Sequence, residues 1–379
     1  MVIDRSLITR IKEKLLGEPK VIVLYGPRQS GKTFLLNKLI EGETRKTMML
    51  KGDDIRVQEV FSLPRYDTLK SFIGDTEVLI IDEAQKIENI GASLKLLFDS
   101  QSIHILVSGS ASFDLANKLA EPMTGRATFF TLYPLSLLEI NSESSKFGLK
   151  SNIDEYLTYG MYPKVHTLTS EKEKQDYLYD VINTYLYNDL LTFKEIKKPK
   201  KIIDLLLLLA LQIGNEVRIN ELALKLQIDR LTVEKYLDIL EKMFIIINIR
   251  GFSRNLRKEI SKTSKYYFVD LGLRNALTRN FNPLHLRNDA GATFENFAIL
   301  ERIKALANKK DYANWYFWRT YDQKEIDLIE EKGGKLEAYE FKLSTKKHSS
   351  AACREFLANY KESTFKIVNT ENLVDFLRQ

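Results

Sequence analysis

Apolar runs alternate with amphipathic segments over the first 140 residues of the chain. The runs predict five β-strands, at Val21–Tyr25, Lys46–Leu50, Val78–Ile81, His104–Val107 and Ala127–Leu132. The amphipathic segments predict helices at Thr33–Glu41, Ile55–Val60, Gly91–Asp99 and Ser112–Leu119. Such alternation is typical of a parallel sheet with helices on both faces. Residues 1–140 are therefore predicted to form an α/β domain that starts with an amphipathic helix.

Residues 141–199 predict a mostly helical segment. Four tyrosines are interleaved there with leucines and acids: Tyr177, Tyr179, Tyr185 and Tyr187. This pattern is typical of core positions, so we interpret the segment as a connector that packs on the first domain. A surface for a partner is the alternative. Five lysines around Pro199 indicate an exposed boundary at the end of the connector.

Residues 200–275 have the element order of a winged helix. Helices at Ile202–Ile213 and Asn220–Leu226 precede a third helix, which Asp229 is predicted to cap. The apolar positions of the third helix predict a core face, made of Leu231, Val233, Leu237, Leu240 and Met243. The remaining positions predict an outward recognition face, made of Arg230, Thr232, Lys235 and Tyr236.

The stretch that follows, up to Tyr267, would form the wing. Phe252 lies among basic residues that recur along it: Arg250, Arg254, Arg257, Lys258, Lys262 and Lys265. This placement of charge suits contacts with DNA phosphates more than the reading of bases. Winged helices also serve as dimerisation or regulatory modules, so a homo-oligomer or a protein partner remains an alternative to nucleic acid.

Residues 285–379 predict the order helix, three strands, helix, strand. The first helix, ATFENFAILERIKAL, carries Glu295, the second strand carries Asp327, and the third strand carries Glu340 and Lys342. Residues two apart on a strand share a face, so Glu340 and Lys342 would point the same way. Both could then meet Asp327 across the hairpin.

A glycine-rich loop follows the first strand of the chain. Gly26 and Gly31 bracket four residues and precede Lys32 and Thr33, which is the spacing of a phosphate-binding loop between a strand and a helix. We expect the loop N–H groups and the start of the helix to bind the phosphates of ATP. Lys32 would neutralise phosphate charge and Thr33 would ligate Mg²⁺. The predicted site comprises Gly26, Pro27, Arg28, Gln29, Ser30, Gly31, Lys32 and Thr33.

Two acids follow a second buried strand, in the sequence VLIIDEAQKI. Asp82 and Glu83 stand at its carboxyl end, where ligands of open α/β sheets bind. Asp82 would hold Mg²⁺ through water, and Glu83 would orient and deprotonate the attacking water. The alternative is a solvated strand end or a helix cap.

Two further residues are candidates for the same site. Ser110, with Ser108 second, follows the strand at His104–Val107, which we expect to lie between the two strands just described. A plain turn with a helix cap at Ser112 is the alternative. Arg126 begins the last strand and could act as an arginine finger supplied by a neighbouring subunit. A surface arginine paired with Glu83 or Asp114 is equally consistent with the sequence.

Four stretches together resemble a known family: GPRQSGKT, VLIIDEAQ, ILVSGSAS and GRATFFTLYPLSLLEI. They are similar to the AAA-type ATPase domain that occurs fused to a C-terminal DUF4143 region, and the resemblance covers most of the chain. Its members are similar to prokaryotic STAND and AAA+ ATPases. The resemblance implies a P-loop core followed by a winged helix and a restriction-nuclease-like domain.

The C-terminal pattern looks like the core of PD-(D/E)XK nucleases. That resemblance implies that Asp327 and Glu340 hold Mg²⁺, that Lys342 positions water or stabilises the transition state, and that Glu295 completes the site. The alternative is that these are exposed residues on a charged surface. A nuclease-derived fold can also lose cleavage and only bind nucleic acid.

Composition narrows the class of protein. The 379 residues are 44% hydrophobic and 28% charged, with a net charge of +6 that permits nucleic-acid binding without requiring it. The single cysteine, Cys353, excludes a disulfide framework and a cysteine-based zinc site. The longest apolar run, Leu205–Ile213, is too short to span a bilayer, and the N-terminus lacks a secretory signal. We therefore expect a cytoplasmic protein.

The sequence as a whole predicts an ATPase that uses ATP to control the engagement of nucleic acid. The predicted domains are residues 1–140, 141–199, 200–275 and 285–379. Three hypotheses remain open: an ATP-gated, Mg²⁺-dependent nuclease, a non-cleaving DNA-binding switch, and a protein-remodelling or signalling ATPase.

Overall fold

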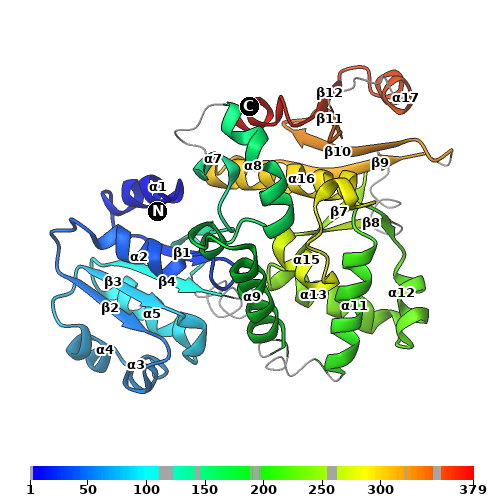
Figure 1. The fold of residues 1–379 in the computed structure, drawn as a ribbon. Coiled ribbons are helices and arrows are strands. Elements are labelled where there is room, and N and C mark those ends of the chain that lie inside the picture. The colour runs from blue at the N-terminus through cyan, green and yellow to red at the C-terminus, as the bar shows by residue number, and fades with distance from the viewer. Residues whose placement is uncertain are drawn as a thin grey trace. The chain divides into compact units, whose positions relative to one another are not determined.

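The structure is a computed structural model that describes residues 3–110, 123–140, 146–187, 190, 196, 198–253, 263–320, 322–344 and 351–379. The chain divides into two compact units, and each has its own β-sheet (Figure 1). The first unit comprises Met1–Leu135 with Lys242–Phe244, and the second comprises Ser136–Glu241 with Ile245–Gln379.

The first unit contains a five-stranded parallel sheet. Its strands are β1 (Val21–Tyr25), β2 (Thr47–Lys51), β3 (Val78–Asp82), β4 (His104–Gly109) and β5 (Ala127–Thr131). Their order across the sheet is β2-β3-β4-β1-β5. All five predicted strands are confirmed. The predicted position of β4 is also confirmed, because β4 lies between β1, which precedes the phosphate loop, and β3, which ends at Asp82.

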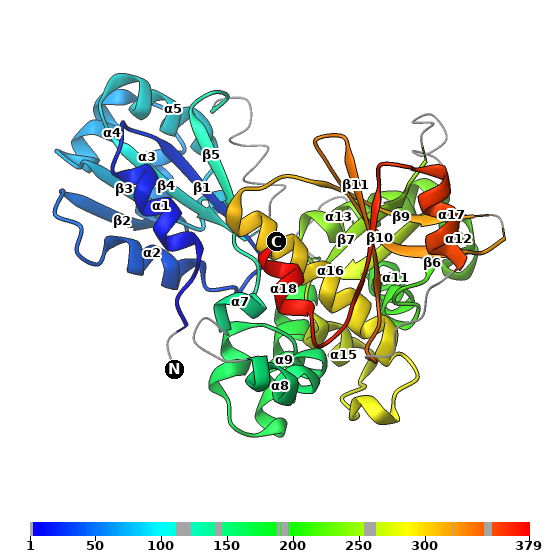
Figure 2. The same ribbon diagram turned by 90° about the horizontal axis from the view of Figure 1, so that it is seen from above.

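Helices cover both faces of this sheet (Figures 1 and 2). The helices of the first unit are α1 (Leu7–Leu15), α2 (Lys32–Ile40), α3 (Ile55–Phe61), α4 (Tyr66–Ile73) and α5 (Ile90–Ser100). Helix α4 was not predicted, because it is only eight residues long and buries two residues, Leu69 and Ile73. The predicted helix at Ser112–Leu119 lies outside the described residues.

Alternate residues of each strand enter two separate cores. On β1, Ile22 and Leu24 pack with α1 and α2, whereas Val21 and Val23 pack with α3, α4 and α5. Every residue of β1 is buried, because successive side chains of a strand point to opposite faces and both faces are covered. This explains why the strands appear in the sequence as uninterrupted apolar runs.

The second unit begins with helices. These are α7 (Leu137–Ile140), α8 (Lys146–Tyr159), the 3₁₀ turn η2 (Pro163–Thr167), α9 (Glu171–Val181), the π-helical segment η3 (Ile182–Tyr187) and α11 (Pro199–Leu211). Helices α8 and α9 belong to this unit, while the packing of the predicted connector on the first domain stays a prediction. Tyr159 on α8 and Tyr179 on α9 both contact the ring of Phe281.

The rest of the second unit is a mixed sheet with helices. The helical elements are α12 (Ile219–Leu226), α13 (Arg230–Lys242), α15 (Leu271–Thr278), η4 (Leu284–Leu286), α16 (Ala290–Lys309), α17 (Ala351–Asn359) and α18 (Leu373–Arg378). The strands are β6 (Glu216–Val217), β7 (Ile246–Gly251), β8 (Ser264–Phe268), β9 (Asn314–Arg319), β10 (Glu325–Lys332), β11 (Lys335–Phe341) and β12 (Thr364–Val368). None of the helices in the described parts of the chain is both long and apolar enough to cross a bilayer.

One continuous sheet joins the strands of the second unit, in the order β12-β11-β10-β9-β7-β8-β6. Strands β7 and β9 pair in parallel, with Arg250 opposite Tyr316. The strands predicted for the wing and those predicted for residues 285–379 therefore share a sheet, while the predicted domain boundaries stay predictions. Helix α16 lies on one face of this sheet and α17 on the other (Figures 1 and 2).

The exposed and buried residues of helix α13 differ in part from the predicted recognition face and core face. Asp229 caps the helix as predicted, because its carboxylate accepts the backbone N–H of Thr232 at 2.8 Å. Tyr236, however, is 1% exposed, and Leu231 is 75% exposed. Tyr236 shares the buried stripe of Val233 and Leu240, at intervals of three and four residues, whereas Leu231 lies in the first turn outside that stripe.

The predicted wing also needs correction. Phe252 does not lie free among basic residues, because its ring packs edge-on against Tyr316 and Tyr360 in an apolar cluster. Arg250 is exposed, as a phosphate contact requires. Lys265 is buried, with 1% of its surface exposed. The other four basic residues of the predicted wing lie outside the described residues: Arg254, Arg257, Lys258 and Lys262.

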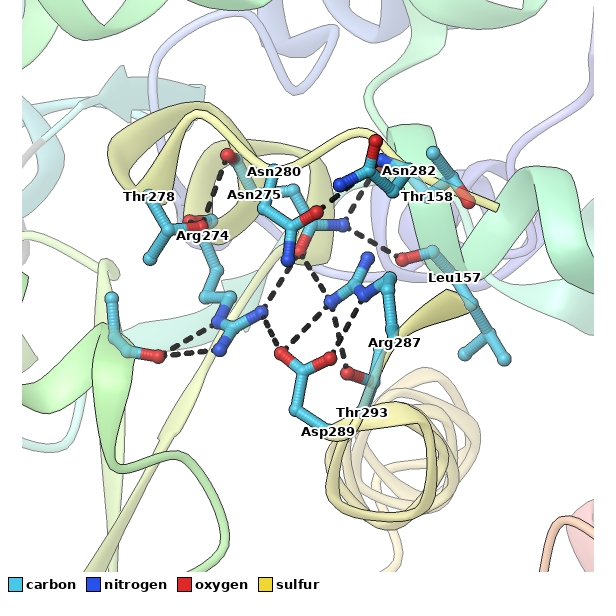
Figure 3. Close-up of polar contacts among 11 residues, drawn as sticks. Leu157, Thr158, Arg274, Asn275, Thr278, Asn280, Asn282, Arg287, Asp289 and Thr293 are labelled. Atoms are coloured by element: carbon cyan, nitrogen blue, oxygen red, sulfur yellow. Dashed lines mark hydrogen bonds and ion pairs between the residues drawn. The ribbon is translucent and has the colours of Figure 1, made fainter. Parts of the chain in front are cut away.

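A buried polar network holds four helices of the second unit together (Figure 3). Arg274 on α15 donates to the carbonyl of Ala210 at the end of α11 and pairs with Asp289 at 2.5 Å, just before α16. Asn275 donates to the carbonyls of Leu157 and Thr158 in α8. The carboxylate of Asp289 is shared with a second buried arginine, Arg287, at 2.8 Å.

Asp289 supplies the negative charge that pairs with both buried arginines, Arg274 and Arg287. Burial opposes its ionisation, but the hydrogen bond from Arg287 and the charge of Arg274 hold the pKa of its carboxyl below the usual range. The network therefore contains two buried cations and one carboxylate, with amide and carbonyl oxygens completing it.

We predict that Asp289→Asn destabilises the second unit by about 2–4 kcal/mol, because two buried guanidinium groups then lack a counter-charge. Urea unfolding followed by circular dichroism measures this. The control is Glu221→Gln, which removes an exposed ion pair with Lys225 on α12 and should leave the midpoint unchanged. Equal midpoints for Asp289→Asn and the wild type would contradict the prediction.

Candidate nucleotide site

The loop between β1 and α2 has the backbone of a phosphate cradle. Gly31 is the N-cap of α2 and adopts a left-handed conformation with φ of 95°. A Cβ at Gly26 would lie 2.2 Å from the carbonyl oxygen of Leu132, so only glycine fits there. Gln29 is also left-handed, with φ of 59°, a conformation that non-glycine residues seldom adopt. The loop is therefore held in a tight curl from Gly26 to Gly31.

Lys32 is buried beneath this loop. Its ammonium donates to the carbonyl oxygens of Gly26 at 3.0 Å and Pro27 at 2.9 Å, and the residue is 5% exposed. Burial lowers the pKa of Lys32 to about 8, against the opposing charges of Glu83 and Asp82. The ammonium is thus charged at neutral pH, and its hydrogen-bond acceptors are uncharged.

Arg5 supports the loop from the segment before α1, although no motif in the sequence marks it. Its guanidinium donates to the carbonyl of Ser30 at 2.7 Å and to that of Tyr133 at 2.6 Å. A single arginine near a chain terminus has no spacing rule that would connect it with a loop 25 residues away. Its role follows only from the three-dimensional contact.

Thr33 and Asp82 meet at the carboxyl end of the sheet. The Thr33 hydroxyl donates to Asp82 Oδ2 at 2.6 Å, although the residues lie 49 positions apart. A hydroxyl and a carboxylate are oxygen ligands of the kind that Mg²⁺ prefers. These two residues therefore fit the predicted role in Mg²⁺ binding.

Ser108 at the end of β4 also contacts Asp82. Its hydroxyl donates to Asp82 Oδ1 and accepts the backbone N–H of Glu83 at 3.3 Å. Ser108, the second candidate in the sequence, is therefore in direct contact with the acid pair. Ser110 is linked to it through a side chain that the sequence analysis did not single out, Gln85.

Gln85 connects Glu83 with Ser110. Its amide nitrogen donates to Glu83 Oε2 at 2.5 Å and to Ser110 Oγ at 3.1 Å. The amide thus fixes the position of the Glu83 carboxylate relative to the end of β4. Gln85 follows Glu83 by two residues in the 3₁₀ turn η1 (Ala84–Lys86), a position with no known sequence rule.

The backbone at Glu83 is held in a left-handed conformation, with φ of 54° and ψ of 41°. Such strain persists only where neighbouring structure enforces it. Gly52 is one such neighbour, because a Cβ on it would lie 2.3 Å from the Glu83 carbonyl oxygen. Its N–H also donates to the carbonyl of Asp82 at 2.7 Å. Gly52 is thus a further residue of the site that no motif identified.

Arg126 does not lie beside this site, and that interpretation of the sequence is wrong. It precedes β5, whose first residue pairs with Val21 at the start of β1, whereas the phosphate loop follows the end of β1. The guanidinium instead forms a two-bond ion pair with Asp99 at 2.7 and 3.1 Å, and not with Glu83. A finger supplied to a neighbouring subunit stays a prediction.

The second predicted site lies between α16 and the sheet of the second unit. We define the carboxylate cluster as Glu295 on α16, Glu325 and Asp327 on β10, and Glu340 on β11. Lys265 on β8 reaches it and pairs with Glu325 at 2.5 Å and with Glu295 at 3.2 Å. The hydroxyl of Tyr267, two residues along β8, donates to the same Glu295 oxygen at 2.5 Å. Lys265 was predicted to lie on an exposed wing, and its burial shows that this prediction is wrong.

Asp327, Glu340 and Lys342 are near one another, but they do not form a ready metal site. Lys342 pairs with Glu340 at 2.7 Å, and Asp327 Oδ2 accepts the backbone N–H of Phe341 at 2.8 Å. Burial and the charge of Glu295 raise the pKa of Asp327 to about 8. Within the described residues no group of three or more acidic, histidine or cysteine side chains has metal-binding geometry. The residues present therefore do not fit Mg²⁺.

Three segments of the chain match family models. Residues 18–141 match an AAA domain, while residues 150–284 and 290–377 match two domains of unknown function, DUF8612 and DUF4143. An uncharacterised protein of Mycobacterium tuberculosis is 26% identical over 372 residues, which are 97% of this chain and 80% of its own. An uncharacterised protein of Methanocaldococcus jannaschii is 26% identical over 315 residues, 78% of this chain and 69% of its own.

Solved structures also align with this chain, at lower sequence identity than these relatives. The Walker-type ATPase of Pyrococcus abyssi aligns with a TM-score of 0.49 and 16% identity, over 73% of this chain and 96% of its own. The RuvB branch migration motor of Thermotoga maritima aligns with a TM-score of 0.32 and 16% identity, over 65% of this chain and 89% of its own. The family matches confirm the resemblance to an AAA-type P-loop ATPase domain followed by a DUF4143 region.

Proposed function

We propose that the protein binds and hydrolyses ATP at the carboxyl end of the first sheet and couples this turnover to the engagement of nucleic acid. The observation that carries the ATPase proposal is the convergence of Lys32, Thr33, Asp82 and Glu83, which come from the ends of two strands. These are the side chains that phosphate binding, Mg²⁺ binding and activation of water require.

Each group has a distinct role in the proposed reaction. The N–H groups of the loop and the start of α2 bind the phosphates, and the charged Lys32 ammonium exchanges its carbonyl acceptors for phosphate oxygens. Thr33 and Asp82 would hold Mg²⁺, which neutralises charge on the β- and γ-phosphates. Glu83 takes a proton from the attacking water.

Gln85 is proposed to position Glu83. A general base acts only within hydrogen-bond reach of the proton it removes, so its carboxylate has to be held in place. Gln85 bonds to one oxygen of Glu83 and also to Ser110, which anchors the amide at the end of β4. Gln85 and Ser110 thus act through Glu83 and carry no proton themselves.

The second unit supports the nucleic-acid proposal. The order α11, β6, α12, α13, β7, β8 is the one predicted for a winged helix, and its β-strands are adjacent as β6-β8-β7. Exposed basic side chains occur on α13 and β7, namely Arg230, Lys235 and Arg250. A net charge of +6 is compatible with a polyanion as the partner.

Two alternatives concern the C-terminal region. The order α16, β9, β10, β11, α17, β12 is the one predicted from the resemblance to PD-(D/E)XK nucleases. Cleavage would require Mg²⁺ at a cluster that does not fit it, so we favour the non-cleaving switch over the nuclease. A protein-remodelling ATPase is the remaining candidate, and a homo-oligomer would allow Arg126 to act on a neighbour.

One experiment separates these functions. Purified protein is mixed with plasmid or with oligonucleotides of increasing length, with Mg²⁺ or Mn²⁺, with and without ATP, and both phosphate release and nicking are measured. The switch predicts phosphate release that rises with DNA length and no nicking. ATP- and metal-dependent nicking would favour the nuclease, and phosphate release that is independent of DNA would favour the protein remodeller.

We predict that Lys32→Ala loses about 2–5 kcal/mol of ATP binding, because the only buried cation of the described loop is removed from the triphosphate. Fluorescent nucleotide titration measures the affinity. Lys38→Ala on the exposed side of α2, where the lysine pairs with Glu41, is the matched control. ATP affinity of Lys32→Ala within twofold of the wild type would refute the phosphate-loop assignment.

We predict that Glu83→Gln binds ATP normally but lowers the turnover rate by about 10²–10⁴, because the general base is lost while the metal ligands remain. Gln85→Ala should lower kcat by roughly tenfold with little change in KM, since only the position of the base changes. In the double variant the Gln85 effect should disappear. Full additivity of the two losses would show that Gln85 does not act through Glu83.

We predict that Lys235→Ala combined with Arg250→Ala reduces the salt slope of DNA binding by about two units, because each side chain contributes one phosphate contact. Binding is measured by fluorescence anisotropy between low and moderate salt. Lys361→Ala, an exposed lysine in the turn before β12, controls for net charge. If the double variant keeps the wild-type slope, the winged helix contacts protein instead.

A further inference from the structure

We infer that Lys265 is the resident cation of the carboxylate cluster: its ammonium supplies the counter-charge that a divalent metal would otherwise supply, so the native protein holds the cluster without metal. The inference goes beyond ATP turnover and does not depend on it. Its basis is the disagreement between the residues present and the metal that the C-terminal resemblance implies.

The ammonium of Lys265 is enclosed by the cluster. It lies 2.5 Å from Glu325 Oε1 and 3.2 Å from Glu295 Oε1, and 1% of the side chain is exposed. On another side the ring of Phe317 lies 5.6 Å from the nitrogen, where its π face favours a cation. An ammonium in contact with two carboxylates supplies the counter-charge that these acids need when they are buried.

The remaining oxygens of the cluster are also largely committed. Tyr267 donates to the Glu295 oxygen that contacts Lys265, and the N–H of Phe341 donates to Asp327. Glu340 Oε1 pairs with Lys342, which leaves Glu340 Oε2 as a buried oxygen with no hydrogen-bond partner. Mg²⁺ would therefore have to displace the ammonium groups and hydrogen-bond donors that already hold carboxylates of this cluster.

Strand β8 directs Lys265 into the carboxylate cluster. Lys265 and Tyr267 are two apart on β8, so both side chains point to the sheet face that α16 covers, and both reach Glu295. Strand β8 belongs to the winged-helix order and not to the C-terminal helix and strands. The cation is therefore supplied by one part of the second unit to acids in another part.

Removing the ammonium should turn the cluster into a metal site. Without Lys265, Glu295 and Glu325 repel each other and lack a counter-charge, which a divalent cation can supply. Lys265→Met keeps most of the volume of the lysine stem while deleting the charge. The variant should therefore gain affinity for Mn²⁺ that the wild type lacks.

The test is calorimetric titration of the full-length protein with Mn²⁺ alone. All proteins carry Asp82→Asn and no nucleotide is added, so the first unit does not contribute a metal ligand pair. We expect no binding in the Lys265-containing protein, micromolar to millimolar binding in Lys265→Met, and loss of that binding in Lys265→Met combined with Glu295→Gln. Lys265→Arg, which keeps the charge, is the matched control and should bind no Mn²⁺.

Thermal unfolding provides a second readout. Lys265→Met should unfold at a lower temperature than the control, and Mn²⁺ should raise its Tm while leaving that of the control unchanged. If Lys265→Met does not fold, the protein that retains Lys265 still tests the inference. The inference would be overturned if this protein bound Mn²⁺ and if Glu295→Gln abolished that binding. Mn²⁺ affinity equal in the presence and absence of Lys265 would overturn it as well. Phosphate release, assayed with Asp82 intact, tests the ATPase proposal separately.

Discussion

The parallel register of β1, β4 and β3 is the constraint on which the nucleotide site depends. Because the three strands run in the same direction and start at the same level, their carboxyl ends coincide. Lys32 and Thr33 follow β1 across the loop, Ser108 is the penultimate residue of β4, and Asp82 is the last residue of β3. A hydrogen bond between residues 49 positions apart, Thr33 to Asp82, is a direct consequence of this register. The two buried cores maintain it, since every residue of β1 and β3 is packed against a helix layer or its neighbours.

The parts of the site that the sequence predicted are those with a local signature. The loop from Gly26 to Thr33 and the pair Asp82 and Glu83 are contiguous, so spacing and strand context identify them. Arg5, Gly52 and Gln85 act through contacts with residues distant in sequence or through one side-chain orientation. No periodicity or spacing rule marks them, because each is an ordinary residue in its own segment. Arg126 shows the converse: its place at the start of the last strand was predicted, but only the pairing of that strand with β1 shows that this start lies at the end of the sheet away from the phosphate loop.

Helix α13 and strand β8 show why charge and burial were misassigned in the second unit. A tyrosine is amphipathic, so Tyr236 fits an outward face in the sequence as well as the buried stripe that it occupies. Lys265 continues a series of basic residues, and a basic residue is exposed by default. Its burial depends on Glu295 and Glu325, which lie 30 and 60 positions further along the chain. Only the three-dimensional structure can show that this lysine contacts two acids so distant in the sequence.

Two buried lysines explain how the candidate sites differ in what they can accept. Lys32 contacts two carbonyl oxygens, and burial lowers its pKa to about 8, so its charge is poorly compensated within the protein. Lys265 is also buried, which opposes its charge, but Glu295 and Glu325 raise its pKa above the usual value. An incoming anion would supply the counter-charge that Lys32 lacks, whereas at Lys265 it would compete with carboxylates already in place. The first site is thus consistent with the proposed binding of a phosphate, whereas the acids of the second already have a counter-charge from the chain itself.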